Sequence, residues 1–505
     1  MKTLVIKVVL LVFVVADFYF VQHANSADYV RVSGASYPHM EVEKISEGDS
    51  GQKNILLKSM KGAEHAKKIE LNRLDTETLN AMLSNESPRE IIGVPRKIEV
   101  LEDQNDMQWN KLPEGGHTAA FTFLSSGAAA LRVGMSIYKL PPLAELRFFK
   151  ENIVNGKAEF VVTGKEINKL IQLNRASDPD NEDSNVYWSP VIEGEFLGIE
   201  IYVPHGVAQN DVHVAVHTLS HFASSPFTSS ENQFTNQAYG DSSACQNDAT
   251  CSSDWLNMRK AVAKMVFTDS GSSYICTGTL LNDADSTTLK PYFISANHCI
   301  SNQTVTSTLQ TIWFFESSTC NGTTLSSNFT TRGGGATLLW TGGATTSALD
   351  SNQDASLLEL LDSPPAGVYY AGWSTSIDAS SLVGIHHPVG DWKKISFGNN
   401  DGDYACYITT DGNFSCIFSS TGSFLAVDWT NGGTQGGSSG SGIFHNSGEL
   451  VGVLKGGNGA CEGFSIYSKF SAAYSAGNLG QWLNTAPPSG NGASIVPILM
   501  LLLNK

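Results

Sequence analysis

The sequence predicts a β-rich protein in two parts, an α+β first half and an all-β second half. With 505 residues, 41% of them hydrophobic and 10% aromatic, the chain can bury two cores. All 8 cysteines lie in the second half, beginning at Cys245. From that point short apolar runs alternate with glycine- and serine-rich turns, which is typical of a β-sandwich or barrel.

Residues 28–222 contain several strand-like runs and one helical candidate. The run from Phe196 to Val203 alternates apolar and polar residues, as a half-buried strand does. The segment from Lys68 to Leu83 has the pattern of an amphipathic helix. The other predicted strands are 128–133, 146–149 and 159–163. Together they predict an α+β body with a mainly β composition.

The second half divides into many short apolar runs. They are 262–267, 292–294, 311–315, 337–340, 356–361 and 450–454. Residues Phe470–Leu483 could form a short helix that closes the domain.

The first residues are typical of an export signal. Lys2 and Lys7 precede an apolar run from Val8 to Ala16, and small residues follow at 24–27. We therefore expect a signal peptide over residues 1–27 and a secreted protein. Because an even number of cysteines in an exported chain indicates disulfides, we expect disulfides and no zinc.

The last residues, 487–505, are predicted to form a linker and a short hydrophobic tail. The apolar run Ile495–Leu503 is about nine residues long, too short to span a bilayer as a helix. The tail resembles the C-terminal sorting tails of exported Gram-negative proteins, which implies an association with the cell surface.

The net charge of −17 argues against two classes of partner. Neither nucleic acid nor an anionic membrane attracts an acidic surface. We expect no cofactor.

One histidine series suggests a metal site as an alternative. His213, His217 and His221 are spaced four apart and would align on a helix. Valines alternate with the first of them, which favours a strand and a structural role. His386 and His387 are adjacent and would point apart, so we expect no shared metal there.

Three segments carry residues suited to acyl transfer. His298 lies in Ser-Ala-Asn-His-Cys, Asp354 precedes Ala-Ser-Leu-Leu, and Ser439 lies in Gly-Gly-Ser-Ser-Gly-Ser-Gly. A glycine-rich turn lets backbone N–H groups converge beside an exposed hydroxyl, as an acyl-enzyme mechanism requires. Taken alone, the turn could equally be a flexible loop.

The order His, Asp, Ser and the flanking residues resemble chymotrypsin-fold serine proteases, in particular the bacterial lysyl endopeptidases. These also share the segment His386-His387-Pro388 and a long propeptide. The resemblance implies a double six-stranded β-barrel over 244–486, a propeptide domain over 28–222, and a processing site in a linker at 223–243. It also implies that the propeptide acts as an intramolecular chaperone or inhibitor.

The resemblance also assigns roles. Ser439 falls on the nucleophile position, His298 on the general base and Asp354 on the residue that orients the histidine. The backbone N–H groups of Gly437 and Ser439 would form the oxyanion hole. Three disulfides follow from the same pattern: Cys245–Cys461, Cys251–Cys320 and Cys276–Cys299. The remaining two, Cys406 and Cys416, are ten apart, and we expect them to staple a hairpin.

The specificity pocket departs from the family pattern. A lysine-binding pocket needs a carboxylate, because an unpaired buried ammonium is costly. Ser465 stands where the lysyl endopeptidases have an aspartate, and Gly433 occupies the other wall position. Lys455 replaces a residue with an aromatic ring and would add positive charge, while Glu462 could supply a carboxylate. The expected pocket residues are Gly433, Thr434, Leu454, Lys455, Gly456 and Ser465.

The processing region gives a second argument about specificity. No lysine or arginine lies between Arg175 and Arg259, an interval that includes the expected processing site. An enzyme that matures itself there cuts after neutral or acidic residues. The sequence thus predicts a secreted serine endopeptidase, made as a preproprotein, that acts on protein or peptide substrates and is not strictly lysine-specific. The alternative is a catalytically silent binding or adhesion module at the cell surface.

Overall fold

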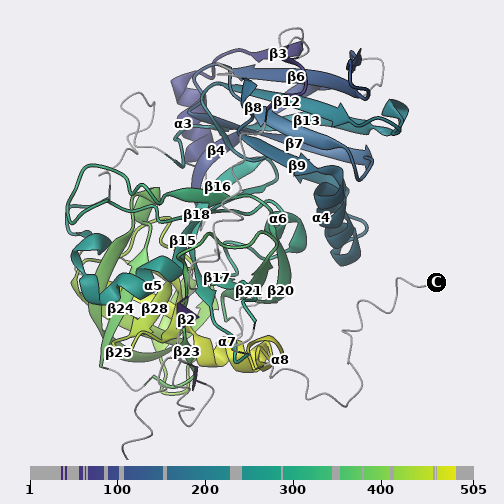
Figure 1. Cartoon of the computed structure of the whole chain (residues 1–505). Coiled ribbons are helices and arrows are strands. Elements are labelled where there is room, and N and C mark those ends of the chain that lie inside the picture. Colours follow the sequence, from purple (N-terminus) through teal and green to yellow (C-terminus); the bar gives the residue numbers. More distant parts are fainter. Residues whose placement is uncertain are drawn as a thin grey trace, which may run out of the picture.

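A computed structural model describes residues 36–37, 40–41 and 56–484 of the chain. Gaps within the last range fall at 61–62, 64–65, 85–88, 102–106, 152–155, 228–241, 286–287, 344–352, 378–379, 410–413, 459–460 and 462. The expected signal peptide, the C-terminal tail, Glu462 and most of the expected linker lie outside the described residues. Figure 1 shows two bodies, an N-terminal body (56–227) above a C-terminal body (242–484).

The C-terminal body contains a closed barrel of six antiparallel strands. Its strand order is β29-β28-β24-β25-β27-β30, and a further pairing between β29 and β30 closes the ring. The strands are β24 (Ser381–His386), β25 (Lys394–Ile408), β27 (Phe424–Asn431), β28 (Gly442–His445), β29 (Leu450–Gly457) and β30 (Phe464–Lys469).

Six further strands form a half-barrel with the order β18-β15-β16-β17-β21-β20. They are β15 (Val262–Asp269), β16 (Ser272–Leu281), β17 (Tyr292–Ser295), β18 (Gln310–Trp313), β20 (Ala336–Gly342) and β21 (Ala355–Leu360). Helix α6 (Gln303–Thr306) packs between β15 and β20, and the Gln303 amide bonds the backbone of β20 at Ala336 and Leu338. The all-β, chymotrypsin-like fold class predicted from the sequence is confirmed.

Short elements complete the C-terminal body. The strands are β14 (Asn247–Asp248), β19 (Thr330–Arg332), β22 (Tyr369–Tyr370), β23 (Trp373–Ser374) and β26 (Phe414–Phe418). The helices are α5 (Leu256–Ala261), α7 (Phe470–Ala476) and α8 (Gly480–Leu483). The predicted closing helix is therefore two short helices, separated where Asn478 adopts a φ of 46°.

The N-terminal body packs two sheets face to face. One has the order β10-β7-β13-β4 and the other β3-β6-β12-β8-β9, and their apolar side chains form one core. The strands are β3 (Lys67–Leu71), β4 (Glu90–Leu101), β5 (Asn110–Lys111), β6 (His117–Ser125), β7 (Ala130–Lys139), β8 (Glu145–Phe149), β9 (Phe160–Thr163), β10 (Val186–Trp188), β11 (Ile192–Glu193), β12 (Phe196–Val203) and β13 (His213–Phe222). The predicted β-rich α+β body is confirmed.

The helices of this body differ from the prediction. The expected helix Lys68–Leu83 is wrong in its first half, where β3 pairs with β6, and helix α3 (Thr76–Leu83) begins only after the N-cap Asp75. Helix α4 (Gly164–Ser177) was not predicted. Its start carries a capping box between Thr163 and Glu166, a local signal that the sequence does contain.

The histidine series lies on strand β13, as the valine alternation favoured. His221 is buried and its Nδ1 shares a 2.8 Å hydrogen bond with Ser125. His213 is exposed and its Nε2 lies 3.0 Å from the carbonyl oxygen of Asn210. One ring is buried and the other exposed, and each bonds a different partner, so these two histidines do not form one site.

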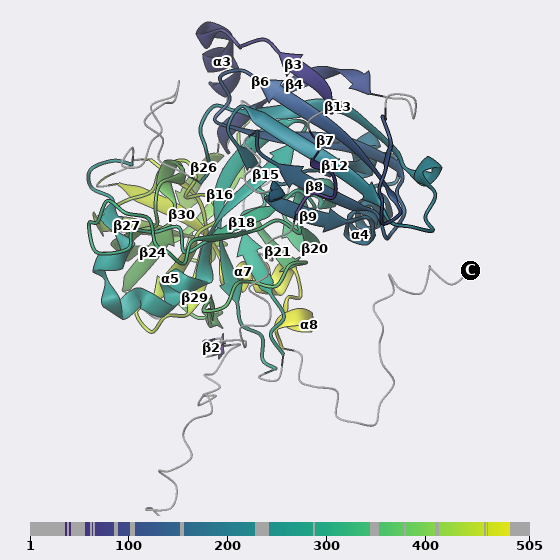
Figure 2. The same ribbon diagram turned by 45° about the horizontal axis from the view of Figure 1, so that its top comes forward.

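Strand β4 joins the two bodies into one sheet. Its first residues pair antiparallel with β16, with Ile91 opposite Tyr274 and Glu90 opposite Ile275. Figure 1 places β4 beside β16, where the bodies meet, and Figure 2 shows the same two bodies against each other in a second view. Two short N-terminal strands, β1 (Ser36–Tyr37) and β2 (Met40–Glu41), also pair with β23 and β22 of the C-terminal body.

Four disulfides fix the C-terminal body. They join Cys245 to Cys461, Cys251 to Cys320, Cys276 to Cys299, and Cys406 to Cys416 across the β25–β26 hairpin. These are the same pairs that the resemblance and the hairpin hypothesis imply.

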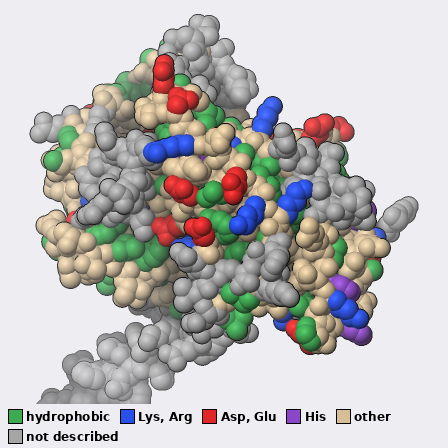
Figure 3. Space-filling view, turned by 90° about the horizontal axis from the view of Figure 1, so that it is seen from above, with side chains coloured by type: hydrophobic (Ala, Val, Ile, Leu, Met, Phe, Trp, Pro, Cys, Tyr) green, Lys and Arg blue, Asp and Glu red, His purple; other side chains and the backbone are tan. Residues whose placement is uncertain are grey.

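The surface of the N-terminal body mixes charges of both signs. In Figure 3 acidic and basic side chains are interspersed over the face seen from above. Within the described residues, no helix is long and apolar enough to cross a membrane.

Candidate active site

His298 and Asp354 meet at the end of one strand pair. His298 follows β17 and Asp354 precedes β21, and these strands pair antiparallel with Ser295 opposite Ser356. Asp354 Oδ2 lies 2.8 Å from His298 Nδ1, and Asp354 Oδ1 accepts the backbone N–H of His298 at 2.9 Å. The carboxylate therefore fixes both the loop and the ring of His298.

The Asp354 carboxylate is held ionised by its neighbours. Burial alone would raise its pKa, but the electrostatic interactions with the His298 imidazole and the Lys455 ammonium and the hydrogen bonds from His298 hold the pKa below its ordinary value. The side chain is only 1% exposed. A charged acceptor at this position keeps the proton of the imidazole on Nδ1.

Lys455 lies beside Asp354. The pairing of β29 with β30 shifts register between Leu454 and Gly456, which leaves Lys455 as the extra residue of a bulge. Its Nζ is 3.2 Å from Asp354 Oδ2 and 4.8 Å from the centre of the Phe414 ring. Lys455 therefore adds a positive charge beside the carboxylate that holds His298.

Ser439 lies in the loop between β27 and β28, pressed against the half-barrel. The Ser439 carbonyl accepts the N–H of Thr277 on β16 at 2.8 Å. A Cβ at Gly440 would lie 2.1 Å from the Ser295 hydroxyl, so only glycine lets the loop approach β17 this closely. This approach brings Ser439 to the strand that leads to His298.

The Nε2 atom of His298 is buried and makes no hydrogen bond to any described atom. Catalytic hydrogen bonds are often long or poorly aligned before substrate binds. Nε2 is therefore the nitrogen available to take a proton.

The turn before Ser439 is held from two sides. The Thr277 hydroxyl donates to the Gly437 carbonyl at 2.9 Å, and the N–H of Val389 donates to the Gly436 carbonyl at 2.5 Å. Gly437 has a φ of 80°, a conformation that favours glycine. These two bonds fix the orientation of the peptide groups that precede Ser439.

A buried hydroxyl–imidazole chain braces the same loop. Ser396 Oγ donates to the Gly433 carbonyl at 2.9 Å, so it accepts from His386 Nε2 at 3.1 Å. His386 Nδ1 then accepts from the Ser438 hydroxyl at 2.8 Å. Burial, with Lys394 nearby, lowers the pKa of His386 to about 3. The ring is therefore neutral in the folded protein.

This chain predicts a specific loss of stability in acid. An unfolded histidine titrates near its ordinary pKa of about 6.5. Between that pH and about 3, the histidine is therefore protonated in the unfolded state and neutral at position 386 of the folded state. Folding stability then falls by about 1.4 kcal/mol per pH unit as pH decreases.

We expect His386→Gln to lack that part of the slope, because glutamine does not titrate. The free energy of unfolding in urea at pH 6, 5 and 4, measured in a Ser439→Ala background, checks this. His213→Gln, at an exposed ring, is the control and should keep the wild-type slope. Equal slopes for His386→Gln and wild type would contradict the assignment of a neutral ring.

The floor of the expected specificity pocket is polar and uncharged. Ser465 is fully buried, and its hydroxyl accepts the indole N–H of Trp429 at 2.8 Å and lies 2.8 Å from Thr434 Oγ1. Gly433 precedes Thr434 and is bonded to Ser396. A side chain at Gly456 would meet open space, so this glycine lies at the open side.

Leu454 is buried in a core cluster with Trp429 and Tyr467, and its backbone bonds the Ser439 loop. The Leu454 carbonyl accepts the N–H of Gly440 and the Leu454 N–H donates to the Ser441 carbonyl, both at 2.9 Å. Trp429 was not predicted, because an indole in a strand has no sequence signal that separates a pocket floor from a core.

A residue of the N-terminal body lies at the site. A Cβ at Gly436 would be 2.0 Å from Glu90 Oε2, so this carboxylate lies against the turn before Ser439. Glu90 is the first residue of β4, which pairs with β16. The N-terminal body therefore covers part of the site.

A closed barrel packed with a half-barrel, with a hydrogen-bonded histidine–aspartate pair at the end of β17, is the arrangement of a trypsin-like serine protease. Comparison with known proteins gives the family. Residues 239–470 match the family model described as "Lysyl endopeptidase, C-terminal domain", and residues 64–223 match "Lysyl endopeptidase N-terminal domain". The chain is similar to the lysyl endopeptidase of Pseudomonas aeruginosa, with 36% identity over 409 residues, covering 76% of this chain and 79% of that protein. The chain belongs to the lysyl endopeptidase family and is a serine-type endopeptidase.

Solved structures are more distant. An HtrA-type protease with a tripeptide is 14% identical with a TM-score of 0.30, and covers 45% of this chain and 62% of that chain, less than two thirds of it. A protease of M. tuberculosis in its active form is 14% identical with a TM-score of 0.31, and covers 50% of this chain and 93% of that chain. At such scores, the fold assignment rests on the strand pairing described above.

Proposed function

We propose that the enzyme hydrolyses peptide bonds with a triad of His298, Asp354 and Ser439. The observation that carries this proposal is the pair of hydrogen bonds that the backbone and ring of His298 donate to Asp354, at 2.9 and 2.8 Å. They hold the imidazole in the tautomer whose Nε2 can accept a proton. The packing of Gly440 on Ser295 supports Ser439 as the partner of that nitrogen.

The reaction then runs through an acyl-enzyme. His298 Nε2 takes the proton of the Ser439 hydroxyl while Oγ bonds to the scissile carbonyl carbon. The N–H groups of Gly437 and Ser439 bind the oxyanion. His298 returns the proton to the leaving amine as the peptide bond breaks. In deacylation His298 Nε2 takes a proton from a water while its oxygen bonds to the ester carbon, and then returns that proton to Ser439 Oγ as the bond from Oγ to the acyl carbon breaks and the new carboxyl product leaves.

The chain would be made as a preproprotein and secreted. Residues 1–27 would be the signal, 28–222 the propeptide domain, 223–243 the linker with the processing site and 244–486 the protease. The pairing of β4 with β16 and the position of Glu90 against Gly436 support an inhibitory propeptide. The tail 487–505 would associate the protein with the cell surface.

The specificity would not be strictly for lysine, although the curated relative is named a lysyl endopeptidase. The buried hydroxyls of Ser465 and Thr434 and the indole of Trp429 supply no negative charge. An ammonium placed against them would be buried without a partner, which is costly. Neutral side chains fit this floor better.

Covalent labelling tests the proposed nucleophile. A fluorophosphonate should form one adduct on Ser439 in the processed protein, located by peptide mapping and mass spectrometry. The adduct should be absent from Ser439→Ala and present in Ser441→Ala, a buried neighbour in the same loop. The unprocessed chain should react more slowly, because β4 and Glu90 cover the site. Absence of an adduct on processed wild-type protein would favour a catalytically silent binding module.

A further inference from the structure

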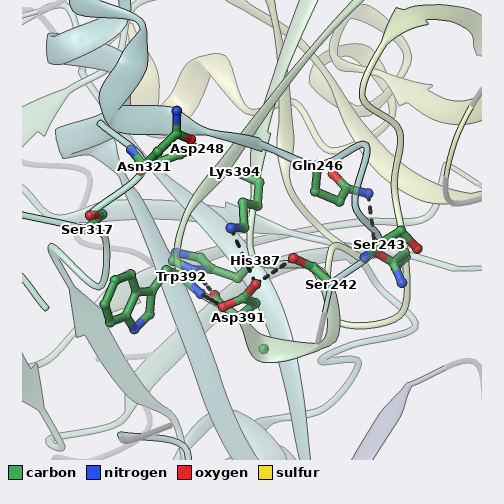
Figure 4. A network of polar contacts seen from close by, with 12 residues as sticks. Ser242, Ser243, Gln246, Asp248, Ser317, Asn321, His387, Asp391, Trp392 and Lys394 are labelled. Carbon is green, nitrogen blue, oxygen red and sulfur yellow. Dashed lines mark hydrogen bonds and ion pairs between the residues drawn. The ribbon is translucent and has the colours of Figure 1, made fainter. Parts of the chain in front are cut away.

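A short segment bridges the start of the C-terminal body and the loop of Ser439. We call residues 242–246 the strap. The hydroxyl of Ser242 donates to Asp391 Oδ2 at 2.5 Å, and the N–H of Ser243 donates to Gln435 Oε1 at 2.8 Å. The amide of Gln246 adds a longer contact to the same Gln435 oxygen, at 3.4 Å. Figure 4 shows Ser242 pointing toward Asp391, with Ser243 and Gln246 beside it.

Gln435 belongs to the turn that contains Gly437. We call residues 435–438 the oxyanion turn. The Gln435 carbonyl accepts the N–H of Ser438 at 3.0 Å, and its N–H donates to the Ser438 hydroxyl at 3.3 Å. Gln435 and Ser438 thus close the turn that contains Gly437, whose N–H we assign to the oxyanion hole. A displacement of Gln435 would therefore move that N–H.

The Asp391 contact leads to the same turn by another route. Asp391 ends a tight turn in which its N–H donates to the Pro388 carbonyl at 2.8 Å. The next residue of that turn, Val389, donates its N–H to the Gly436 carbonyl at 2.5 Å. The strap therefore bonds to both turns: to the turn 388–391 through Asp391 and to the turn before Ser439 through Gln435. The Val389–Gly436 bond joins these two turns directly.

The anchor at Asp391 is itself well held. Its side chain is buried, Oδ1 accepts the N–H of Trp392 at 2.7 Å, and Lys394 Nζ lies 3.4 Å from Oδ2. The strap is also fixed covalently, because Cys245 is bonded to Cys461.

Position 438, directly before the proposed nucleophile, is a buried serine bonded to His386. It has no carboxylate that could pair with the strap, so the strap contacts this turn through Gln435 instead. We propose that Gln435 is a positioning residue for the oxyanion hole, and that it does this by binding the strap, which the active enzyme must retain. This inference rests on the proposed triad and oxyanion hole. It predicts that processing within 223–243 leaves Ser242 and Ser243 attached to the protease.

The test compares three variants, each produced as the full chain and assayed after processing. Gln435→Leu removes the acceptor and keeps the approximate size, and should lower kcat on a peptide substrate by about 10- to 100-fold while KM changes little. Gln435→Glu keeps an acceptor oxygen and should restore kcat. Ser242→Ala, a smaller change at the other end, should lower kcat less. All three should melt within a few degrees of the wild type.

Binding of a peptide boronate distinguishes positioning from a general structural role. Its affinity should weaken in parallel with kcat in Gln435→Leu, because the boronate mimics the oxyanion. Unchanged kcat in Gln435→Leu, or equal loss in Gln435→Glu, would overturn the inference, as would a mature N-terminus beyond Ser243. Fluorophosphonate labelling of wild-type Ser439 separates the two proposals, since the triad can hold while this inference fails.

Discussion

Replacing Asp354 with asparagine should lower kcat about 10⁴-fold near neutral pH. The backbone N–H of His298 needs an acceptor, so the amide oxygen of the asparagine would take the place of Oδ1. The amide nitrogen would then face His298 Nδ1, which must become the acceptor. The ring proton would move to Nε2, the atom that has to take the proton of Ser439.

Lys455 makes this substitution more severe. Its Nζ lies 3.2 Å from Asp354 Oδ2, where the variant would place an NH₂ group opposite an ammonium. The kcat and KM of the processed enzyme on a peptide substrate measure the effect, and KM should change little. Asp362→Asn is the control: this half-buried carboxylate accepts the N–H of Gly333 at 3.2 Å and should be replaceable with less than about a threefold change. If Asp354→Asn kept a tenth of wild-type activity, the proposed role of Asp354 would be wrong.

The fold was predictable because its signals are local. Alternating apolar runs between glycine-rich turns predicted the strands, and the flanks of His298, Asp354 and Ser439 predicted three positions that lie far apart in the chain. The structure brings the first two into direct contact. Helix α4 was not predicted, although Thr163 and Glu166 form a capping box, because the strand-like run 159–163 leads directly into it. The sequence therefore does contain a local signal for this helix.

Other features have no local signal. Strand β4 pairs with β16 across a separation of about two hundred residues, and nothing in either segment identifies the partner. The bulge that turns Lys455 toward Asp354 depends on the register of β29 against β30. Gln435 carries no motif, and its contact with Ser243 comes only from tertiary packing. Contacts of this kind require the three-dimensional structure.

The pocket floor predicts the second large effect. Replacing Ser465 with aspartate should raise the preference for lysine over a neutral residue of similar length at the cleavage site by about 10²- to 10³-fold in kcat/KM. The floor already has two groups that can donate to a carboxylate there, the Trp429 indole and the Thr434 hydroxyl, both 2.8 Å from Ser465 Oγ. A new carboxylate would therefore be hydrogen-bonded before substrate arrives, and its charge would be left to pair with the lysine ammonium.

The comparison uses matched peptides with lysine or methionine before the scissile bond, cleaved by processed wild type, Ser465→Asp and Ser465→Asn. Asparagine has nearly the size of aspartate without its charge, so Ser465→Asn should keep the wild-type ratio. A gain in both variants would point to pocket shape instead of charge. Wild-type enzyme that cleaved only the lysine peptide would show that a carboxylate outside this floor pairs with the ammonium. Specificity for lysine at this floor thus depends on whether the group at position 465 is charged.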